Sequence, residues 1–86
     1  MKSVIFDNDA LEHWGDWLIV NRKIALKILE LIKDIDRTPF EGKGKPEALK
    51  HNFKGCWSRR ITDEHRLIYR INEKGLTEVI SCKGHY

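Results

Sequence analysis

The spacing of the hydrophobic residues changes across a loop at residues 39–47, which holds two prolines and two glycines. Before the loop the hydrophobic residues recur at helical spacing, and after it they lie in short strand-like runs. A chain of 86 residues builds only one hydrophobic core, so both halves must contribute to it. We therefore predict a single domain, residues 1–86, of the α+β class, with two α-helices packed on one face of a small antiparallel β-sheet.

Two helices are expected before the loop, after a short first strand at residues 2–6. Asp9, with Glu12 three residues later, fits an acidic capping box and predicts the start of the first helix. This helix is expected to end near Asn21. The second helix is predicted to end at about Thr38, because Pro39 stops it. Its apolar stripe comprises Ile24, Ile28, Leu31, Ile32 and Ile35.

After the loop, strands are predicted at residues 57–62, 66–71 and 76–82, with a further short strand at 49–53. A three-residue connection at 63–65 pairs Thr62 with Arg66 and separates hydrophobic from basic side chains, whereas a two-residue connection would bury charge. The hydrophobic face then holds Trp57, Ile61, Leu67, Tyr69 and Ile71, and the basic face holds Ser58, Arg60, Thr62, Arg66 and Arg70.

The last strand is expected to pair through Ile71 opposite Leu76. This pairing places Leu76, Ile80 and Cys82 on the hydrophobic face, and Thr77, Val79, Ser81 and Lys83 on the basic face. Two helices cover only one side of the sheet, so the basic face is predicted to stay open. An extended tail would add His85 to it.

The charge is unevenly distributed along the chain. Residues 1–42 contain six Lys and Arg against eight Asp and Glu, whereas residues 43–86 contain ten against five. Such an asymmetry favours a polyanionic partner, because clustered cations release counterions from phosphates on binding. A solvated strand surface explains the charge alone equally well.

Several classes of protein are disfavoured by the sequence. The amino terminus has no signal-peptide pattern and no run has the roughly 20 apolar residues of a membrane span, so a cytoplasmic protein without a membrane partner is expected. Cys56 and Cys82 lack the paired spacing of a zinc site, and we predict two free thiols that fill the core. No cofactor and no metal is expected.

The basic half contains residue types that suit cleavage of RNA through its own 2′-hydroxyl. This reaction needs a base, cations for the phosphate, and an acid for the departing 5′-oxygen. Glu47 suits the base, with Lys50 near it to keep it ionised, and His85 suits the acid, because imidazole titrates near neutrality. Arg66 and Arg60 suit the phosphate, because guanidinium donors match paired oxygens.

Each residue also has a structural interpretation. His85 fits a frayed end and Glu47 a helix cap, and Arg59 is predicted to lie on the core side with a structural role. Tyr86 suits stacking on a base or packing against the domain. His51 and His65 fit RNA contacts or solvated surface positions, Lys45 is a further RNA-contacting candidate, and Trp14 and Trp17 are expected in the core.

The chain resembles the YoeB family of bacterial toxins, within the RelE/ParE superfamily. The resemblance covers essentially the whole chain and includes the Trp-bearing first helix. It is carried by residues 38–47 (TPFEGKGKPE), 49–52 (LKHN), 57–62 (WSRRIT), 64–69 (EHRLIY) and the closing His85-Tyr86.

The resemblance implies a RelE-like microbial ribonuclease fold and a ribosome-dependent endoribonuclease that cuts mRNA in the A site of the 70S ribosome. By matching position, Glu47 would be the general base, His85 the general acid and Arg66 the transition-state stabiliser. Lys50, Arg60 and Tyr86 would support the same site. The implied partners are a YefM-like antitoxin that orders on binding and a second copy of the chain in a homodimer.

Two other functions stay open at this point. One is a basic protein that binds RNA or the ribosome without cutting, and the other is the gyrase-inhibiting branch of the superfamily. Glu47, Arg66 and His85 together favour the enzyme, because binding alone has no use for an acid and a base. The tail and the 57–60 tract argue against a gyrase inhibitor.

Overall fold

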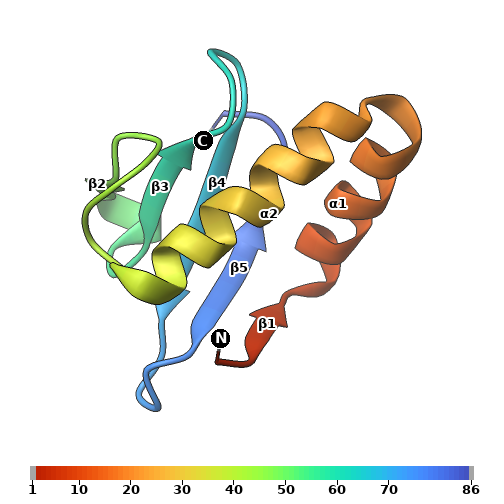
Figure 1. The fold of residues 1–86 in the computed structure, drawn as a ribbon. Helices are drawn as coiled ribbons and strands as arrows, with labels where there is room; N and C mark the ends of the chain where they lie inside the picture. Colours follow the sequence, from red (N-terminus) through yellow and green to blue (C-terminus); the bar gives the residue numbers. More distant parts are fainter. Residues whose placement is uncertain (1, 86) are drawn as a thin grey trace.

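The computed structural model describes residues 2–85, which form two long helices and five strands. Along the chain these are β1 (Val4–Phe6), α1 (Asn8–Val20), α2 (Arg22–Arg37), β2 (Glu47–Ala48), the 3₁₀ turn η1 (His51–Phe53), β3 (Trp57–Arg60), β4 (Arg66–Ile71) and β5 (Thr77–Ser81). Both helices lie on one face of the sheet, with α2 crossing it and α1 beside β1 (Figure 1). The predicted α+β architecture is confirmed.

The sheet has the strand order β1-β5-β4-β3-β2. The pairs β2–β3, β3–β4 and β4–β5 are antiparallel, but β1 runs parallel to β5, so the sheet is mixed and not purely antiparallel as expected. The two helices follow β1 in the chain and separate it from the other four strands. Parallel strands need a long connection, often helical, and these helices form part of the connection between β1 and β5.

The N-cap of helix α1 lies two residues before the predicted one at Asp9. The backbone N–H of Asp7 still donates to the Val79 carbonyl (2.9 Å), and the Asp7 carbonyl accepts from Leu11 (3.0 Å). Asp7 is therefore the N-cap, and Asp9 lies in the first turn. Asn21 ends α1 and begins α2, as its amide donates to Trp17 and its side chain accepts from Ile24. The predicted ends of both helices are confirmed.

Strands β3 and β4 pair with the predicted alternation but through a longer turn. Arg60 lies opposite Arg66 and Arg59 opposite Leu67, so the connection spans residues 61–65 and not 63–65. The pairing differs from the prediction by two residues, which leaves every side chain on its predicted face. The five-residue turn is closed by the amides of Ile61 and Thr62, which both donate to the His65 carbonyl.

Strand β5 contains a bulge that the sequence did not reveal. Ile68 pairs with Ser81 and Tyr69 with Val79, so Ile80 is an extra residue in β5. The prediction was wrong for Thr77 and Val79, which are buried, and for Leu76 and Ile80, which lie outside the main core. It was right for Ser81 and Cys82, because the bulge restores the alternation beyond Ile80.

The core lies between the helices and the covered face of the sheet. It consists of Ala10, Trp17, Ala25, Ile28, Leu31, Ile32, Ile35, Ile61, Leu67, Tyr69, Val79 and Cys82, with Trp14 packed against it. The indole N–H groups of Trp14 and Trp17 donate to the carbonyls of Ala25 (3.1 Å) and Cys82 (2.9 Å). Both cysteines are free thiols, as predicted, but only Cys82 belongs to the core, since Cys56 is half-buried outside it. Burial raises the pKa of Cys82 to about 12.

The predicted strand at residues 49–53 is wrong. Pairing stops after Ala48, and His51–Phe53 form a 3₁₀ turn that His51 enters with a φ of +57°. The Leu49 amide still donates to the Cys56 carbonyl (3.0 Å), but the Phe53 amide bonds to Lys50 within the turn. The local hydrogen bonds of the turn replace those of a strand ladder.

Arg59 is fully buried on the core side of β3, and its guanidinium ties the 38–44 loop to the domain. It forms an ion pair with Asp34 of α2 (2.6 Å) and donates to the carbonyls of Thr38 (2.6 Å), Glu41 (2.9 Å) and Lys43 (3.1 Å). The predicted structural role is confirmed. The loop that leads to β2 is thus fixed from within the core.

Candidate active site

A hollow on the open face of the sheet contains most of the predicted site residues. Its volume is about 520 Å³, and it lies where β2, the end of β3, the start of β4 and the tail meet. The lining comprises Lys45, Pro46, Glu47, Ser58, Arg60, Arg66 and His85. The proposed base, acid and phosphate-binding arginine, which are up to 38 positions apart in sequence, therefore line one hollow.

The sheet register explains how the residues on the strands come together. Glu47 lies opposite Ser58 across β2 and β3, and Arg60 lies opposite Arg66 across β3 and β4. Ser58 and Arg60 are two residues apart, so they share a face. Directly opposed residues have Cβ atoms about 5 Å apart, so the two arginines form a paired cationic site beside one carboxylate.

Like charges in opposed positions destabilise a sheet, so this pair has a cost that an anionic ligand would remove. Arg66 is half-buried, and its Nη1 donates to the carbonyls of Thr62 (2.7 Å), Asp63 (3.2 Å) and His65 (3.2 Å). These bonds hold the guanidinium group through its Nη1 atom. The Nε–Nη2 edge is the edge that binds two phosphate oxygens side by side.

The loop before β2 brings Lys45 and Glu47 to the hollow. The Arg60 amide donates to the Gly44 carbonyl (2.7 Å), which fixes the loop against the end of β3. Lys45 has a φ of +52°, a conformation that a non-glycine residue adopts at a cost of roughly 1 kcal/mol or more. Strain at a lining residue is common at ligand sites, since the surrounding structure maintains it.

The tail places His85 at the hollow through its preceding residue. Gly84 has a φ of +82°, which favours glycine, and its amide donates to His65 Nδ1 (2.8 Å). Its carbonyl accepts from the Arg66 amide (3.0 Å). His65 was expected to be solvated or to contact RNA; the structure shows it half-buried and packed against Trp17, so the solvated interpretation is wrong.

Two predicted residues are not among the described residues that line the hollow, and a third is not described. Lys50 and His51 are exposed just beyond β2, and Tyr86 lies outside the described residues. Ser58 and Pro46 line the hollow without having been predicted as functional. Ser58 was on the predicted basic face, so its position was available from the alternation, but a buried serine has no sequence signature of function.

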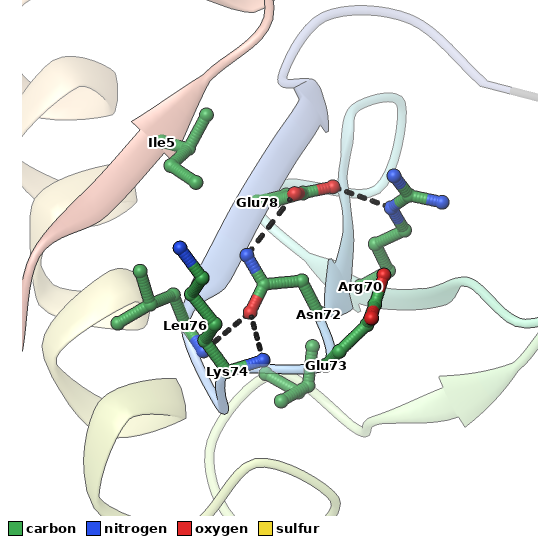
Figure 2. A pocket seen from close by; sticks show the side chains of 8 residues that line it. Ile5, Arg70, Asn72, Glu73, Lys74, Leu76 and Glu78 are labelled. Atoms are coloured by element: carbon green, nitrogen blue, oxygen red, sulfur yellow. Dashed lines mark hydrogen bonds and ion pairs between the residues drawn. The ribbon is translucent and has the colours of Figure 1, made fainter.

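A second hollow, of about 410 Å³, lies at the opposite end of β4, beside the β4–β5 turn. Asn72 is at its centre: its amide donates to Glu78 (3.2 Å), and its Oδ1 accepts from the amides of Lys74 and Leu76 (2.9 Å each), as Figure 2 shows. Arg70 is paired with Glu78. Glu78 thus neutralises the predicted basic face at this end of β4. The hydrogen bonds of Asn72 close the β4–β5 turn, and this closure explains the second hollow.

Within residues 2–85, no three His, Cys, Asp or Glu side chains are grouped as a metal ion would require. No helix in that range is sufficiently long and apolar to cross a membrane.

The fold and the hollow together define a small α+β domain with an open cationic sheet face and with a glutamate and a histidine at one end of it. Residues 6–86 match the family described as the YoeB-like toxin of bacterial type II toxin–antitoxin systems. The chain is also 55% identical over 78 residues to Toxin YoeB of Escherichia coli strain K12, a match that covers 87% of this chain and 92% of the relative. The chain therefore belongs to the YoeB family of toxins.

Solved structures agree with this assignment. A YoeB/ParE toxin from Agrobacterium tumefaciens superposes with a TM-score of 0.94 at 40% identity, covering 99% of this chain and 100% of that one. The toxin in a heterotetrameric YoeB–YefM toxin–antitoxin complex from Staphylococcus aureus gives 0.91 at 41% identity, covering 100% and 99%. A YoeB dimer from the same organism gives 0.89 at 42% identity, covering 98% and 97%.

Proposed function

We propose that this toxin is a ribosome-dependent endoribonuclease that cuts mRNA in the A site of the 70S ribosome and so inhibits translation. The observation that supports the proposal is the single hollow lined by Glu47, Arg66 and His85, which come from β2, β4 and the tail. A base, a bidentate cation and an acid around one shared space are what cleavage through the 2′-hydroxyl needs.

In the proposed reaction, Glu47 accepts the proton of the 2′-hydroxyl, and the resulting oxygen attacks the adjacent phosphorus. Arg66 binds the non-bridging oxygens as negative charge develops, and Arg60 and Lys45 add positive potential on the same side. The bond to the 5′-oxygen breaks as His85 gives it a proton. The products are a 2′,3′-cyclic phosphate and a free 5′-hydroxyl, and one proton has passed from the substrate to Glu47 and one from His85 to the leaving group.

Ribosome dependence is supported by the openness of the site. Glu47, Arg60 and His85 are all exposed, so the domain alone does not exclude water from the reacting groups. Electrostatic catalysis is stronger where water is excluded. A large RNA-containing partner that closes over the hollow would supply this exclusion and would hold the substrate in line with the 2′-oxygen.

The proposed partners follow from the charge and from the relatives. The cationic face fits mRNA and ribosomal RNA, and Lys50 and His51, which are exposed and follow β2 in the chain, offer further contacts. The complex and the dimer from Staphylococcus aureus support a YefM-like antitoxin and a homodimer for this chain. A toxin that acts on ribosomes would work in the cytoplasm.

Primer extension on a defined mRNA in a reconstituted translation system tests the proposal. The wild type should produce new 5′ ends at the A-site codon, and Glu47→Ala, Arg66→Ala and His85→Ala should remove them. Lys23→Ala, an exposed cation on α2, serves as the matched control and should cut at the wild-type rate. Translation arrest without new 5′ ends, unchanged in the three variants, would instead establish a basic ribosome-binding protein that does not cut.

A further inference from the structure

His65 lies at the end of the β3–β4 turn, outside the hollow, and yet contacts the tail that bears His85. Its ring packs edge-on against Trp17, with the ring centroids 4.8 Å apart and an interplanar angle of 76°. Its Nδ1 accepts a hydrogen bond from the Gly84 amide at 2.8 Å. The His65 backbone is fixed in turn by the Thr62 hydroxyl, which accepts from its amide (3.1 Å).

The tail segment 82–84 is held at several points, which include a bond from the Cys82 amide to His13 Nδ1 (3.3 Å) and a bond from the Cys82 thiol to the Ala10 carbonyl (3.5 Å). The Trp17 indole N–H donates to the Cys82 carbonyl (2.9 Å), the Arg66 amide donates to the Gly84 carbonyl (3.0 Å), and His65 accepts from the Gly84 amide. The backbone of His65 also contacts the Arg66 side chain, because its carbonyl accepts from Arg66 Nη1 (3.2 Å). His65 therefore bonds both the tail and the Arg66 guanidinium, beside the direct bond from the Arg66 amide to Gly84.

The chemistry of this contact requires an acceptor at the Nδ1 position. A neutral imidazole with its proton on Nε2 provides one, whereas the imidazolium has two donors and no acceptor. Lys83 of the tail carries a charge close to this contact, because its Nζ lies 5.9 Å from the centroid of the Trp17 ring and 3.9 Å from the Asp16 carboxylate. The Lys83 ammonium thus lies over the indole against which the His65 ring packs.

We propose that His65 is a positioning residue, whose Nδ1 clamps the Gly84 amide and thereby sets where His85 stands relative to Arg66 and Glu47. The functional meaning of this clamp rests on the proposed endoribonuclease activity, but the clamp itself is a property of the free protein. Gly84 alone does not determine the tail, because glycine populates several backbone conformations with similar ease. The hydrogen bond to His65 selects one of them.

Three substitutions separate the hydrogen bond from the bulk of the side chain. His65→Asn keeps an acceptor close to the Nδ1 position, since its Oδ1 branches at the same atom as the imidazole Nδ1. His65→Gln places its polar atoms one bond further out, near the position of Nε2. His65→Ala removes both the acceptor and the bulk of the side chain. Thermal unfolding of each variant confirms that it is folded. A further variant, Gly84→Ala, disturbs the same contact from the tail. Its added Cβ would meet no atom within 4 Å, but an alanine disfavours the positive φ of this position.

The first measurement is made on the free protein by NMR. The ¹⁵N shifts of His65 should identify the Nε2–H tautomer, and the Gly84 amide should be protected from exchange in the wild type and in His65→Asn. In His65→Gln, His65→Ala and Gly84→Ala the protection of Gly84 should fall at least about tenfold, as the loss of one hydrogen-bonded constraint predicts. Equal protection in all variants would overturn the clamp.

The second measurement is single-turnover cleavage on programmed ribosomes. We expect His65→Ala and His65→Gln to cut roughly 10- to 100-fold more slowly at saturating toxin, since a misplaced catalytic group costs this much. Ribosome affinity should stay within about twofold of the wild type, and His65→Asn should recover most of the rate. If a variant loses the protection of the Gly84 amide but cuts at the wild-type rate, the positioning role of His65 is refuted. If the wild-type protein never cuts, the proposed function is refuted, and the NMR measurement alone decides whether the clamp exists.

Discussion

Arg59 shows how a single residue supports the site from the opposite face of the sheet. It is fully buried, and its guanidinium charge is matched by Asp34, which is 7% exposed. A buried ion pair adds little over a hydrophobic pair, but removing one partner leaves the other charge uncompensated. Of the remaining guanidinium donors, Nε binds the Tyr69 hydroxyl (3.2 Å) and the others bind three carbonyls of the 38–43 loop. The network therefore orders the segment that leads to Lys45 and Glu47.

Asp34→Asn should therefore lower the free energy of unfolding by about 3 kcal/mol, because the Arg59 charge stays buried without a counter-charge. Urea denaturation of the two proteins measures this difference. Asp36→Asn is the matched control, because Asp36 lies on the same helix, is half-buried and accepts an exposed backbone hydrogen bond from Lys2. This variant should change stability by less than about 0.5 kcal/mol. Similar losses in both variants would mean that the buried pair has no special role.

The same carboxyl predicts how stability varies with pH. The hydrogen bond from the Lys43 amide, followed by the Arg59 guanidinium, lowers the pKa of Asp34 below its ordinary value of 3.8. A group with a lowered folded pKa stabilises the fold above its unfolded pKa, and this contribution is lost as the pH falls through the folded value. The stability difference between the wild type and Asp34→Asn should hence be constant above about pH 5 and shrink below about pH 4. A difference that grows on acidification would contradict the assignment.

At the scale of elements, the 38–46 connection depends on one glycine. Gly44 has a φ of +81°, and a Cβ there would lie 3.1 Å from Arg59 Cβ, from the Arg60 carbonyl and from Leu31 Cδ2. Gly75, in the β4–β5 turn, has nearly the same φ of +78°, but its nearest neighbour would be the mobile end of Lys2 at 3.6 Å. The two glycines share the backbone conformation and differ in the space around them.

Gly44→Ala should thus destabilise the domain more than Gly75→Ala does. Both substitutions incur a strain of roughly 1 kcal/mol for an L-residue in the left-handed region, and Gly44→Ala adds a further overpacking cost of about 1–3 kcal/mol. It should also weaken the Arg60–Gly44 hydrogen bond and shift the loop that bears Glu47. Chemical denaturation gives the two free energies, and equal losses would show that crowding at Gly44 is relieved without cost.

The elements also show where sequence reasoning succeeded and where it could not. The faces of β3 and β4 were predictable, because period-two alternation survives any turn of odd length. The bulge at Ile80 could not be predicted. Val79 and Cys82 both reach the core only because β5 contains one extra residue between them, and nothing in the local sequence marks Ile80 as that residue. The start of α1 depends on the bond between Asp7 and Val79, which is a tertiary contact.

At the scale of the whole molecule, the candidate site joins a predictable part with an unpredictable one. Alternation placed Arg60 and Arg66 on the open face, and the helices leave that face uncovered (Figure 1). The meeting of Glu47 with them depends on a two-residue strand that pairs opposite Ser58, and the place of His85 depends on the contact between Gly84 and His65. Both are tertiary contacts of single residues, which hydrophobic periodicity does not encode.

The charge distribution of the molecule predicts the salt dependence of RNA binding. Each phosphate that a cation neutralises contributes about 0.7 to the slope of log K against log salt for a single strand. Arg60→Gln and Arg66→Gln, on the open face, should each reduce the slope by about 0.7. Arg22→Gln removes the same charge from the exposed start of α2, on the helical side of the sheet, and should leave the slope unchanged.

Fluorescence anisotropy with a labelled RNA oligonucleotide measures these slopes, and 2′-O-methyl groups throughout the oligonucleotide prevent its cleavage during the titration. A dependence confined to the two sheet-face variants would locate the bound strand over the hollow. Equal changes in all three variants would indicate a diffuse attraction set by the net charge of +3 alone. No measurable binding at low salt would leave the cationic face as a solvated surface, and the affinity for the ribosome would then have to come from contacts with protein.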